Sequence, residues 1–322
     1  MLRALQLLLV VCSIAIVGLA SHRQASASDS VAPWAPRLGD ESVVYVRIGM
    51  VITAEGGACR GIEGTTPVPI EWPEQQVEII DEDVSAHVDR VSYRMVGGTV
   101  QQMLVRVPFL AAGDEARTVV TFEVRRRAVV EPETTAELIV PASRDLENLV
   151  RLYLRPSKGI ESTNRRIKQQ AREVSEGQQT AWQKVEAIYD WVRDNVEYVD
   201  GPFKGALRAL RDGDGDCEEL SSLFIAMCRA EGIPARTVWV PGHCYPEFYL
   251  HDAEGNGFWF PCQAAGSREF GAMQETRPIL QKGDNFRDPD RPREAQRYVS
   301  EFLTGAGGKP KVRFIREVVN EP

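Results

Sequence analysis

The apolar residues of this sequence change their spacing once along the chain, near residue 150. From residue 42 to about residue 140, apolar and polar side chains alternate, most clearly over residues 118–125. Alternation with period two is typical of strands that bury one face, and short strands at regular spacing are typical of a β-sandwich. After Pro156 the apolar residues recur at helical intervals instead. We therefore expect an α+β protein in which strands come first and helices follow.

The chain length agrees with two domains, because 322 residues divide into units of about 100–200 residues each. We place a β-sandwich domain at residues 33–150 and a second, helix-containing domain at residues 151–322. In the second domain, Thr180 and Gln183 have the spacing of a capping box at a helix start. Residues 311–319 are predicted to form a last strand.

Composition and charge exclude several classes of protein. With 43% hydrophobic and 26% charged residues the chain is neither disordered nor a multi-spanning membrane protein. The net charge of −8 argues against nucleic acid or anionic lipid as a partner. Six cysteines are too few for a disulfide-dense scaffold, so the position of each one matters more than their number.

The N-terminal segment has the layout of a secretory signal peptide, which we place at residues 1–27. Arg3 precedes 17 uncharged residues, and Ala25-Ser26-Ala27 offers a cleavage site. The alternative is a retained membrane anchor, although the apolar run is shorter than the roughly 20 residues that span a bilayer comfortably. In both cases the rest of the chain lies outside the cytoplasm, in the periplasm or secreted. The membrane is a partner only if this segment is retained.

Cleavage at this place would leave five cysteines, and an odd number in an exported protein leaves at least one thiol unpaired. Cys228 follows Cys217 by eleven residues, which is about 16 Å along one helix and beyond disulfide reach. We expect Cys228 to be a small core residue. Cys59 lies in the β-rich half without a local partner, and we expect it to be buried or free.

A helix that begins at Cys217 carries the strongest chemical signal. Asp216 is a good N-cap residue, and Glu219 completes a capping box three residues later. The helix dipole and the free N–H groups at this end favour a thiolate at Cys217. Four acidic residues oppose it by like charge, namely Asp214, Asp216, Glu218 and Glu219. A reactive thiol at this position therefore needs a cationic partner, for which histidine is the natural residue.

The chain has four histidines, and one of them is suitably placed. His22 would leave with the signal peptide, and His87 lies in the β-rich half. His243 opens a predicted strand over residues 243–249, and a loop that contains His251 leads to a second strand over residues 258–263.

These motifs together resemble the transglutaminase-like superfamily, which has a papain-like arrangement of a helix on an antiparallel sheet. The resemblance rests on Gly215-Asp216-Cys217-Glu218-Glu219, on His243-x-x-x-Glu247-Phe248-Tyr249, and on the pair Phe258-Trp259. They stand in the order of the family, and the resemblance spans roughly residues 181–286. It implies a catalytic cysteine at Cys217 and a catalytic histidine at His243.

The third member of the family's triad is altered. The family usually has Asp four residues after the tryptophan, and counting from Trp259 reaches Gln263. A Gln carbonyl can accept a hydrogen bond from the histidine and fix its tautomer, but it stabilises an imidazolium less than a carboxylate does. Asp252 is a poor substitute because it lies at the tip of the predicted hairpin. We take Gln263 as the third member.

The resemblance implies covalent catalysis on an amide. The Cys217 thiolate attacks the carbonyl, His243 protonates the leaving amine, and water or an amine resolves the thioester. The backbone N–H of Cys217 would help to bind the oxyanion, and Trp182 and Tyr198 are weak candidates for a second donor. The expected partner is a protein or peptide substrate, and no cofactor is implied.

Two metal sites are alternatives to this interpretation. The spacing Asp212-x-Asp214-x-Asp216 suggests a calcium loop, but Cys217 and Leu223 occupy the positions where an EF-hand needs Gly and Glu. The set His243, Cys244 and Cys262 suggests zinc, but it contains no C-x-x-C pair. We therefore expect no metal.

Cys244 and Cys262 are neighbours of His243 and Gln263 in the sequence. If His243 faces Gln263 across antiparallel strands, Cys244 faces Cys262 on the opposite side of the sheet. A disulfide between them is one expectation, and two reduced core thiols are the other.

Two functions stay open from the sequence. The first is an exported cysteine hydrolase or acyl-transferase that acts on peptide or isopeptide amides, which the pair Cys217 and His243 favours. The second is a binding or assembly module with little or no catalytic activity, which Gln263 favours.

Overall fold

The computed structural model describes residues 32–319, and from Pro33 onward they form one compact unit. The signal peptide predicted for residues 1–27 lies outside the described residues. No helix in the described part of the chain is both long enough and apolar enough to cross a membrane.

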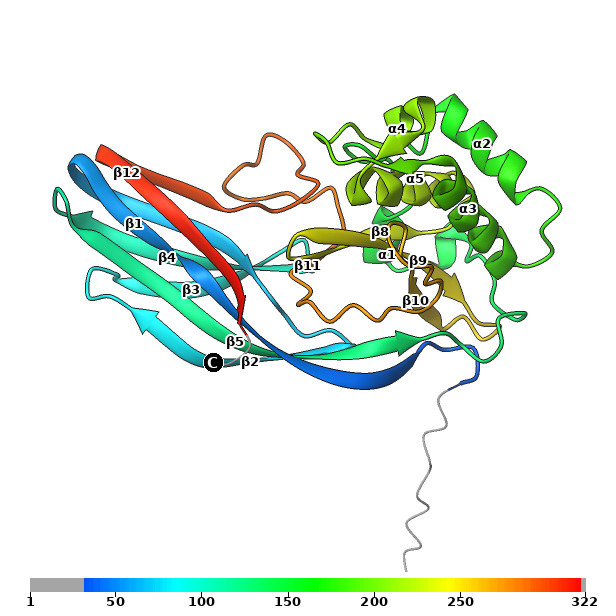
Figure 1. The fold of residues 1–322 in the computed structure, drawn as a ribbon, viewed down its shortest axis with the longest axis horizontal. Coiled ribbons are helices and arrows are strands. Elements are labelled where there is room, and N and C mark those ends of the chain that lie inside the picture. Colours follow the sequence, from blue (N-terminus) through cyan, green and yellow to red (C-terminus); the bar gives the residue numbers. More distant parts are fainter. Residues whose placement is uncertain (1–31, 320–322) are drawn as a thin grey trace, which may run out of the picture. The chain divides into compact units, whose positions relative to one another are not determined.

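The β-rich half is organised around one long strand (Figure 1). Its strands are β1 (Arg37–Val68), β2 (Gln75–Val84), β3 (Arg90–Val96), β4 (Val100–Leu110), β5 (Glu115–Val130) and the C-terminal β12 (Phe302–Val319). The first part of β1 pairs with β5 and the last part pairs with β4, while β12 runs antiparallel along both. Bulges between Glu55 and Cys59 and between Arg60 and Glu63 bend β1 between these two partners.

Both parts of β1 contribute to a single hydrophobic core. Ile48 and Met50 from the first part and Ile62 from the second are fully buried in it, together with residues of β4 and β5. Cys59 lies in the same core and is unpaired, as predicted. The strands form one connected sheet rather than two separate ones, and the β-sandwich therefore stays a prediction.

The second half contains the helices and a group of antiparallel strands. In chain order its elements are η1 (Ser143–Asp145), α1 (Asn148–Leu152), α2 (Arg165–Ser175), α3 (Ala181–Asn195), β6 (Glu197–Tyr198), α4 (Ala206–Asp212), β7 (Asp214–Gly215), α5 (Cys217–Ala230), β8 (Ala235–Val240), β9 (His243–His251), β10 (Gly257–Pro261) and β11 (Gln281–Lys282). The chain therefore has the expected α+β composition.

Helix α5 is the centre of this half, and it packs against β8 and β9 on one side and against α2, α3 and α4 on the other. The predicted capping boxes are confirmed at both helix starts, with Thr180 capping α3 and Asp216 capping α5. Gly232, with φ of 79°, follows the end of α5 in a conformation that other residues rarely adopt. Cys228 is completely buried on α5, as predicted.

One sheet joins the two halves of the molecule. Gln281 of β11 pairs with Trp239 of β8 on one side and with Val100 of β4 on the other, so the sheet runs without a break from β10 to β2. The predicted last strand over residues 311–319 is confirmed, but it begins at Phe302 and pairs with β1 of the first half. The domain boundary at residue 150 therefore stays a prediction. The C-terminal strand follows that boundary in the sequence, but it pairs with a strand that precedes it.

Buried charges lie where the two halves meet. Lys282 Nζ is 2.6 Å from Glu74 and 3.0 Å from Glu247, and Arg236 forms a second ion pair with Glu247. All of these side chains are nearly or completely buried. Arg126 of β5 is also buried, 3.9 Å from Glu74. Removing one member of such a set leaves an uncompensated buried charge, so these pairs couple the β-rich half to β8, β9 and β11.

Candidate active site

Cys217 is the first residue of α5, and the turn before it is fixed by the capping box. The Asp216 side chain accepts a hydrogen bond from the backbone N–H of Glu218 at 2.7 Å, and the Glu219 side chain accepts one from the N–H of Asp216 at 3.2 Å. Cys217 is half-buried and occupies the first position of the helix. The sequence therefore folds so that a thiol sits at the positive end of a helix dipole.

The acidic residues around Cys217 are compensated by cations and a backbone amide from other parts of the chain. Lys204 forms an ion pair with Asp214, and Arg297 forms one with Glu218. Glu219 is buried and accepts the backbone N–H of Lys204 at 2.7 Å. The expected repulsion of a Cys217 thiolate is therefore weakened by neighbouring cations and amides.

His243 begins β9 and lies next to Gln263, which follows β10. The imidazole Nε2 is 2.9 Å from Oε1 of Gln263. Because a carbonyl oxygen can only accept, Nε2 carries the proton and Nδ1 is left to face Cys217. Burial alone would lower the pKa of His243, but hydrogen bonds with Cys217 and Gln263 and the charge on Cys217 raise it above its ordinary value. The structure thus brings together the three residues that the sequence placed in one triad.

Two other histidines of the described chain lie elsewhere. His87 is in the β-rich half, 3.6 Å from Asp114. His251 is buried at the end of β9, where its backbone pairs with Ile139. Asp252 caps the hairpin that follows and accepts hydrogen bonds from Trp34 and Asn256, so it does not replace Gln263.

Of the two alternatives for Cys244 and Cys262, the disulfide is wrong and the pair of reduced core thiols is confirmed, because both residues are free and buried. The reason is the register of the two strands. Pro261 pairs with Glu247, and the Cys262 N–H bonds to the carbonyl of Pro246 at 3.0 Å, which is two residues away from the expected position opposite Cys244. Cys262 Sγ lies 3.7 Å from that same carbonyl oxygen, whereas Cys244 Sγ lies 3.9 Å from Ser221 Oγ on α5.

Cys244 instead supports the nucleophile. Its thiol and its backbone N–H are both hydrogen-bond influences that lower the pKa of Cys217. The thiol hydrogen bond is the largest influence that lowers the pKa of Cys217 to about 5; burial opposes it, and His243 lowers the pKa further. The pKa of Cys244 itself is raised by the same hydrogen bond and by burial, so Cys244 stays a neutral donor. The sequence offered one signal for this role, the position of Cys244 directly after the histidine.

Helix α3 fixes the backbone of Gln263. Tyr189 Oη and Arg193 Nη1 each donate to the carbonyl oxygen of Gln263 at 2.8 Å. The N–H of Gln263 bonds to the carbonyl of Glu269, also at 2.8 Å. The backbone carbonyl and the backbone N–H of Gln263 are thus both hydrogen-bonded, which fixes the position from which its side chain reaches His243. No motif in the sequence points to this role for Tyr189 or Arg193.

The two candidates for a second oxyanion donor occupy different environments. Tyr198 pairs with Gly215 in the short parallel ladder of β6 and β7, which places it beside the residues that precede Cys217. Its hydroxyl donates to Asp200 at 3.1 Å. Trp182 is buried in an aromatic cluster of the core with Phe248, Phe260 and Phe270. The surroundings of Trp182 give it a packing role, and a role as oxyanion donor stays a prediction for both residues.

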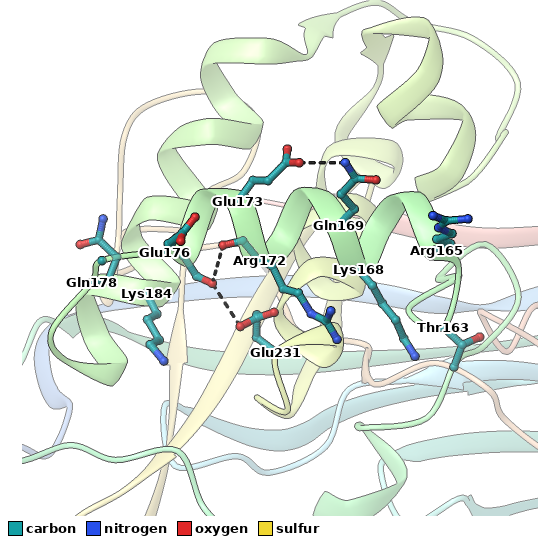
Figure 2. A pocket seen from close by; sticks show the side chains of 12 residues that line it. Thr163, Arg165, Lys168, Gln169, Arg172, Glu173, Glu176, Gln178, Lys184 and Glu231 are labelled. Carbon is teal, nitrogen blue, oxygen red and sulfur yellow. Dashed lines mark hydrogen bonds between the residues drawn. The ribbon is translucent and has the colours of Figure 1, made fainter.

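A surface hollow of about 820 Å³ lies away from this site (Figure 2). It is lined by α2, by Lys184 at the start of α3, and by Glu231 after the end of α5. Cys217 begins α5, so the length of this helix, about 21 Å, separates the hollow from the nucleophile. Its lining mixes cations and acids, and it contains neither cysteine nor histidine. Within residues 32–319 there is also no group of three His, Cys, Asp or Glu residues that could hold a metal ion.

Comparison with known proteins agrees with the geometry. The family model described as "Transglutaminase-like superfamily" matches residues 168–264, a segment that contains Cys217, His243 and Gln263. A search of curated proteins found no match.

Among solved structures, that of a candidate cysteine protease from Cytophaga hutchinsonii is 18% identical, with 89% of this chain and 94% of that chain covered and a TM-score of 0.58. This likeness shows a shared fold across both halves. The periplasmic domain of TgpA from Pseudomonas aeruginosa, bound to ethylmercury, is 15% identical, with 72% of this chain and 91% of that chain covered. Its TM-score of 0.32 is too low to indicate a shared overall fold. Residues 168–264 therefore form a transglutaminase-like domain.

Proposed function

We propose that this protein is an exported cysteine hydrolase or acyl-transferase that cleaves amide bonds of peptides or isopeptides. The observation that carries the proposal is the arrangement of Cys217, His243 and Gln263 at the start of α5, in which the pKa of Cys217 is lowered to about 5. A thiol with a strongly lowered pKa, hydrogen-bonded to an oriented histidine, is the arrangement of a nucleophile and its base. The fold shared with a candidate cysteine protease supports the same class of reaction.

The reaction follows from the positions of the three side chains. The Cys217 thiolate attacks the amide carbon, and the backbone N–H at the start of α5 stabilises the oxyanion, with Tyr198 as a candidate second donor. His243, charged in the resting pair, gives the proton on Nδ1 to the leaving nitrogen as the C–N bond breaks. Water or an amine then attacks the thioester, His243 takes up its proton, and the thiolate is released. Gln263 keeps the imidazole in the required tautomer throughout.

Export is the second part of the proposal, and it rests on the signal-like sequence of residues 1–27. A reduced active-site thiol is compatible with this location, because the described cysteines are all free and most are buried. The proposed β-sandwich would then be exported together with the catalytic half and would support it structurally outside the cytoplasm.

The test is the rate of alkylation of Cys217 by iodoacetamide as a function of pH. At pH 6 a thiol with a pKa of about 5 has about a thousandfold more thiolate than one with the ordinary value of 9.0. The weaker nucleophilicity of the less basic thiolate removes about a hundredfold of that gain, so Cys217 should react about tenfold faster than in the unfolded chain.

His243→Ala should abolish most of this advantage, and His87→Ala, which changes an exposed histidine of the β-rich half, should leave it intact. The second candidate function, a non-catalytic binding module, is favoured by the neutral Gln263 in place of a carboxylate. It would be supported instead if Cys217 reacted at pH 6 no faster than an ordinary thiol in both the wild type and His243→Ala.

A further inference from the structure

Arg277 stands beside the catalytic pair, on a segment that follows Gln263 in the chain. Its Nη1 donates to the carbonyl oxygen of Pro241 at 3.1 Å. Pro241 and Gly242 form the turn that leads directly into His243. Arg277 is therefore attached to the backbone on the His243 side of the site.

The guanidinium of Arg277 is only partly used by the protein. Its Nε and Nη2 donate to Glu275 at 2.9 Å and 2.5 Å, and Nη1 donates to Pro241. A guanidinium has five N–H donors, so one N–H on each terminal nitrogen has no acceptor among the described residues. The Arg277 side chain is 39% exposed, whereas that of Glu275 is 9% exposed. The Glu275 carboxylate is therefore nearly buried, and the Arg277 guanidinium is the member of the pair that faces solvent.

The charge of Arg277 reaches both reacting side chains. Hydrogen bonds to Glu275 raise the pKa of Arg277 most, and the negative charge of Cys217 raises it further. The pKa of His243 is set mainly by burial and by its hydrogen bonds to Cys217 and Gln263, and the charge of Arg277 adds a smaller lowering effect. The hydrogen bond to Pro241 holds this cation beside the turn into His243, where it can meet a substrate bound at the catalytic pair.

The other flank of Cys217 is anionic. Asp200 accepts the hydroxyl of Tyr198, and Asp216 caps α5 directly before Cys217. Burial and the neighbouring Glu219 raise the pKa of Asp216 to about 6, so Asp216 is mostly charged at neutral pH. The site therefore has the Arg277 cation on its His243 side and the Asp216 carboxylate at the start of α5.

We propose that Arg277 binds a carboxylate on the leaving-amine part of the substrate, an inference that rests on the proposed function. His243 delivers its proton to the leaving nitrogen, so the leaving part must lie on the His243 side, where Arg277 presents its free N–H groups. The C–S bond forms, the C–N bond breaks and the nitrogen takes the proton of His243, while the carboxylate leaves unchanged with the amine. The preferred substrate is a peptide whose residue after the scissile bond carries either a free α-carboxylate or an acidic side chain.

The first experiment compares alkylation of Cys217 by iodoacetate and by iodoacetamide in the full chain. Both reagents form the same C–S bond and release iodide, and they differ in carrying a carboxylate or an amide. We expect Arg277→Gln to lower the ratio of the iodoacetate rate to the iodoacetamide rate about fivefold, as for a partly exposed charge pair. Arg277→Lys keeps the positive charge but loses the paired N–H donors of the guanidinium, so it should give an intermediate ratio.

The matched control is Arg117→Gln. Arg117 is also 39% exposed and paired with one acid, Asp83, but it lies in the β-rich half. Its ratio should equal that of the wild type. An unchanged ratio in Arg277→Gln, or an equal fall in Arg117→Gln, would overturn the assignment of Arg277. The iodoacetamide rate alone shows whether Arg277→Gln has disturbed the turn before His243, because that rate depends on the thiolate and not on the carboxylate.

The second experiment separates the two sources of the carboxylate. Three probes carry the same bromoacetyl group on glycine, on isoglutamine and on glycinamide, which present an α-carboxylate, a side-chain carboxylate and none. Faster labelling by bromoacetylglycine than by bromoacetylglycinamide, lost in Arg277→Gln, indicates a C-terminal residue as the leaving group. The same pattern with bromoacetylisoglutamine indicates an acidic residue. Equal rates for all three probes would overturn the proposal.

These outcomes are distinct from failure of the proposed function. If Cys217 is not a reactive thiolate, all probes react slowly at pH 6 in every variant. If Cys217 is reactive but Arg277 has no role in recognition, the rates are high and do not depend on the carboxylate.

Discussion

At the scale of single residues, Cys244 is the donor that most affects the nucleophile. Its thiol lowers the pKa of Cys217 more than any other group does. We expect Cys244→Ala to raise the pKa of Cys217 by about one unit, because one donor to the thiolate is lost while the backbone N–H remains. The acid limb of the iodoacetamide pH profile should move upward by the same amount, so that labelling is lost at a higher pH as the pH falls.

Cys262→Ala is the matched control for this variant. Cys262 is a buried thiol directly after β10, and its sulfur contacts the carbonyl of Pro246. The pH profile of Cys217 should be unchanged in Cys262→Ala. A profile that moves equally in both variants would show that the effect comes from loosened packing rather than from the lost donor.

Gln263 orients His243 by a hydrogen bond from an uncharged amide. Replacing this amide by a carboxylate should change the pKa of His243 measurably. In Gln263→Glu a carboxylate would face the imidazole and raise the pKa of His243 further, since it stabilises the charged form. The alkaline limb of any activity profile should move to higher pH, because the charged pair then survives longer as pH rises. Gln263→Ala should instead lower turnover by about tenfold or more, through loss of the orienting contact.

Titration of His243 by NMR measures the direction of both shifts without requiring turnover. A pKa of His243 that stays the same in Gln263→Glu and Gln263→Ala would contradict the contact between the two side chains. Glu269→Gln makes a comparable change in a residue that meets Gln263 through its backbone carbonyl, so the His243 titration should be retained.

The sequence was sufficient for the residues that lie on consecutive elements and insufficient for those that depend on strand register or distant loops. Cys217, His243 and Gln263 could be ordered from their motifs. The separation of Cys244 from Cys262 could not, because it depends on a register of β9 and β10 that differs by two residues from the expected one. Arg277 reaches the site through a segment without regular structure, whose path no local pattern specifies.

At the scale of elements, the cap of α5 has both a structural and a chemical role. Asp216→Ala and Thr180→Ala each remove the side chain of a capping box, from α5 and α3 respectively. Each should lower the free energy of unfolding by about 1 kcal/mol. Only Asp216→Ala should also change the alkylation rate of Cys217, because only α5 begins at the nucleophile.

Urea unfolding gives the stability of the two variants, and iodoacetamide labelling under native conditions gives the reactivity. An equal change of Cys217 reactivity in Thr180→Ala would contradict a local role of the α5 cap.

Helix starts of this kind could be predicted because capping is a local interaction of three or four residues. The length of β1 could not be predicted from the sequence. This strand of 32 residues pairs first with β5 and then with β4, and the position of the bulges between the two partners depends on the neighbouring strands.

At the scale of the whole molecule, the buried ion pairs of Lys282 connect the β-rich half to the catalytic half. Lys282→Met would leave Glu74 and Glu247 with one cation fewer in a buried setting. We expect a loss of about 3–5 kcal/mol in the free energy of unfolding, because an unpaired buried charge is costly. Lys311→Met removes a lysine that is 69% exposed and paired with Glu55, and should cost about 1 kcal/mol or less. Urea titrations of both variants measure the difference, and equal costs would mean that the buried pairs do not join the halves.

The continuous sheet leads to a last prediction, that both halves unfold in one cooperative transition. Cys59 in the core of the β-rich half and Cys228 on α5 are both fully buried free thiols, so each reports the opening of its own half. Because β11 links β8 to β4 and β12 returns to β1, neither half can separate without breaking strand pairs of the other. Mass spectrometry of the labelled peptides across a urea gradient should therefore give one midpoint for Cys59 and Cys228. Two well-separated midpoints would show instead that the boundary near residue 150, drawn from the change in apolar spacing, divides the chain into independently folding domains.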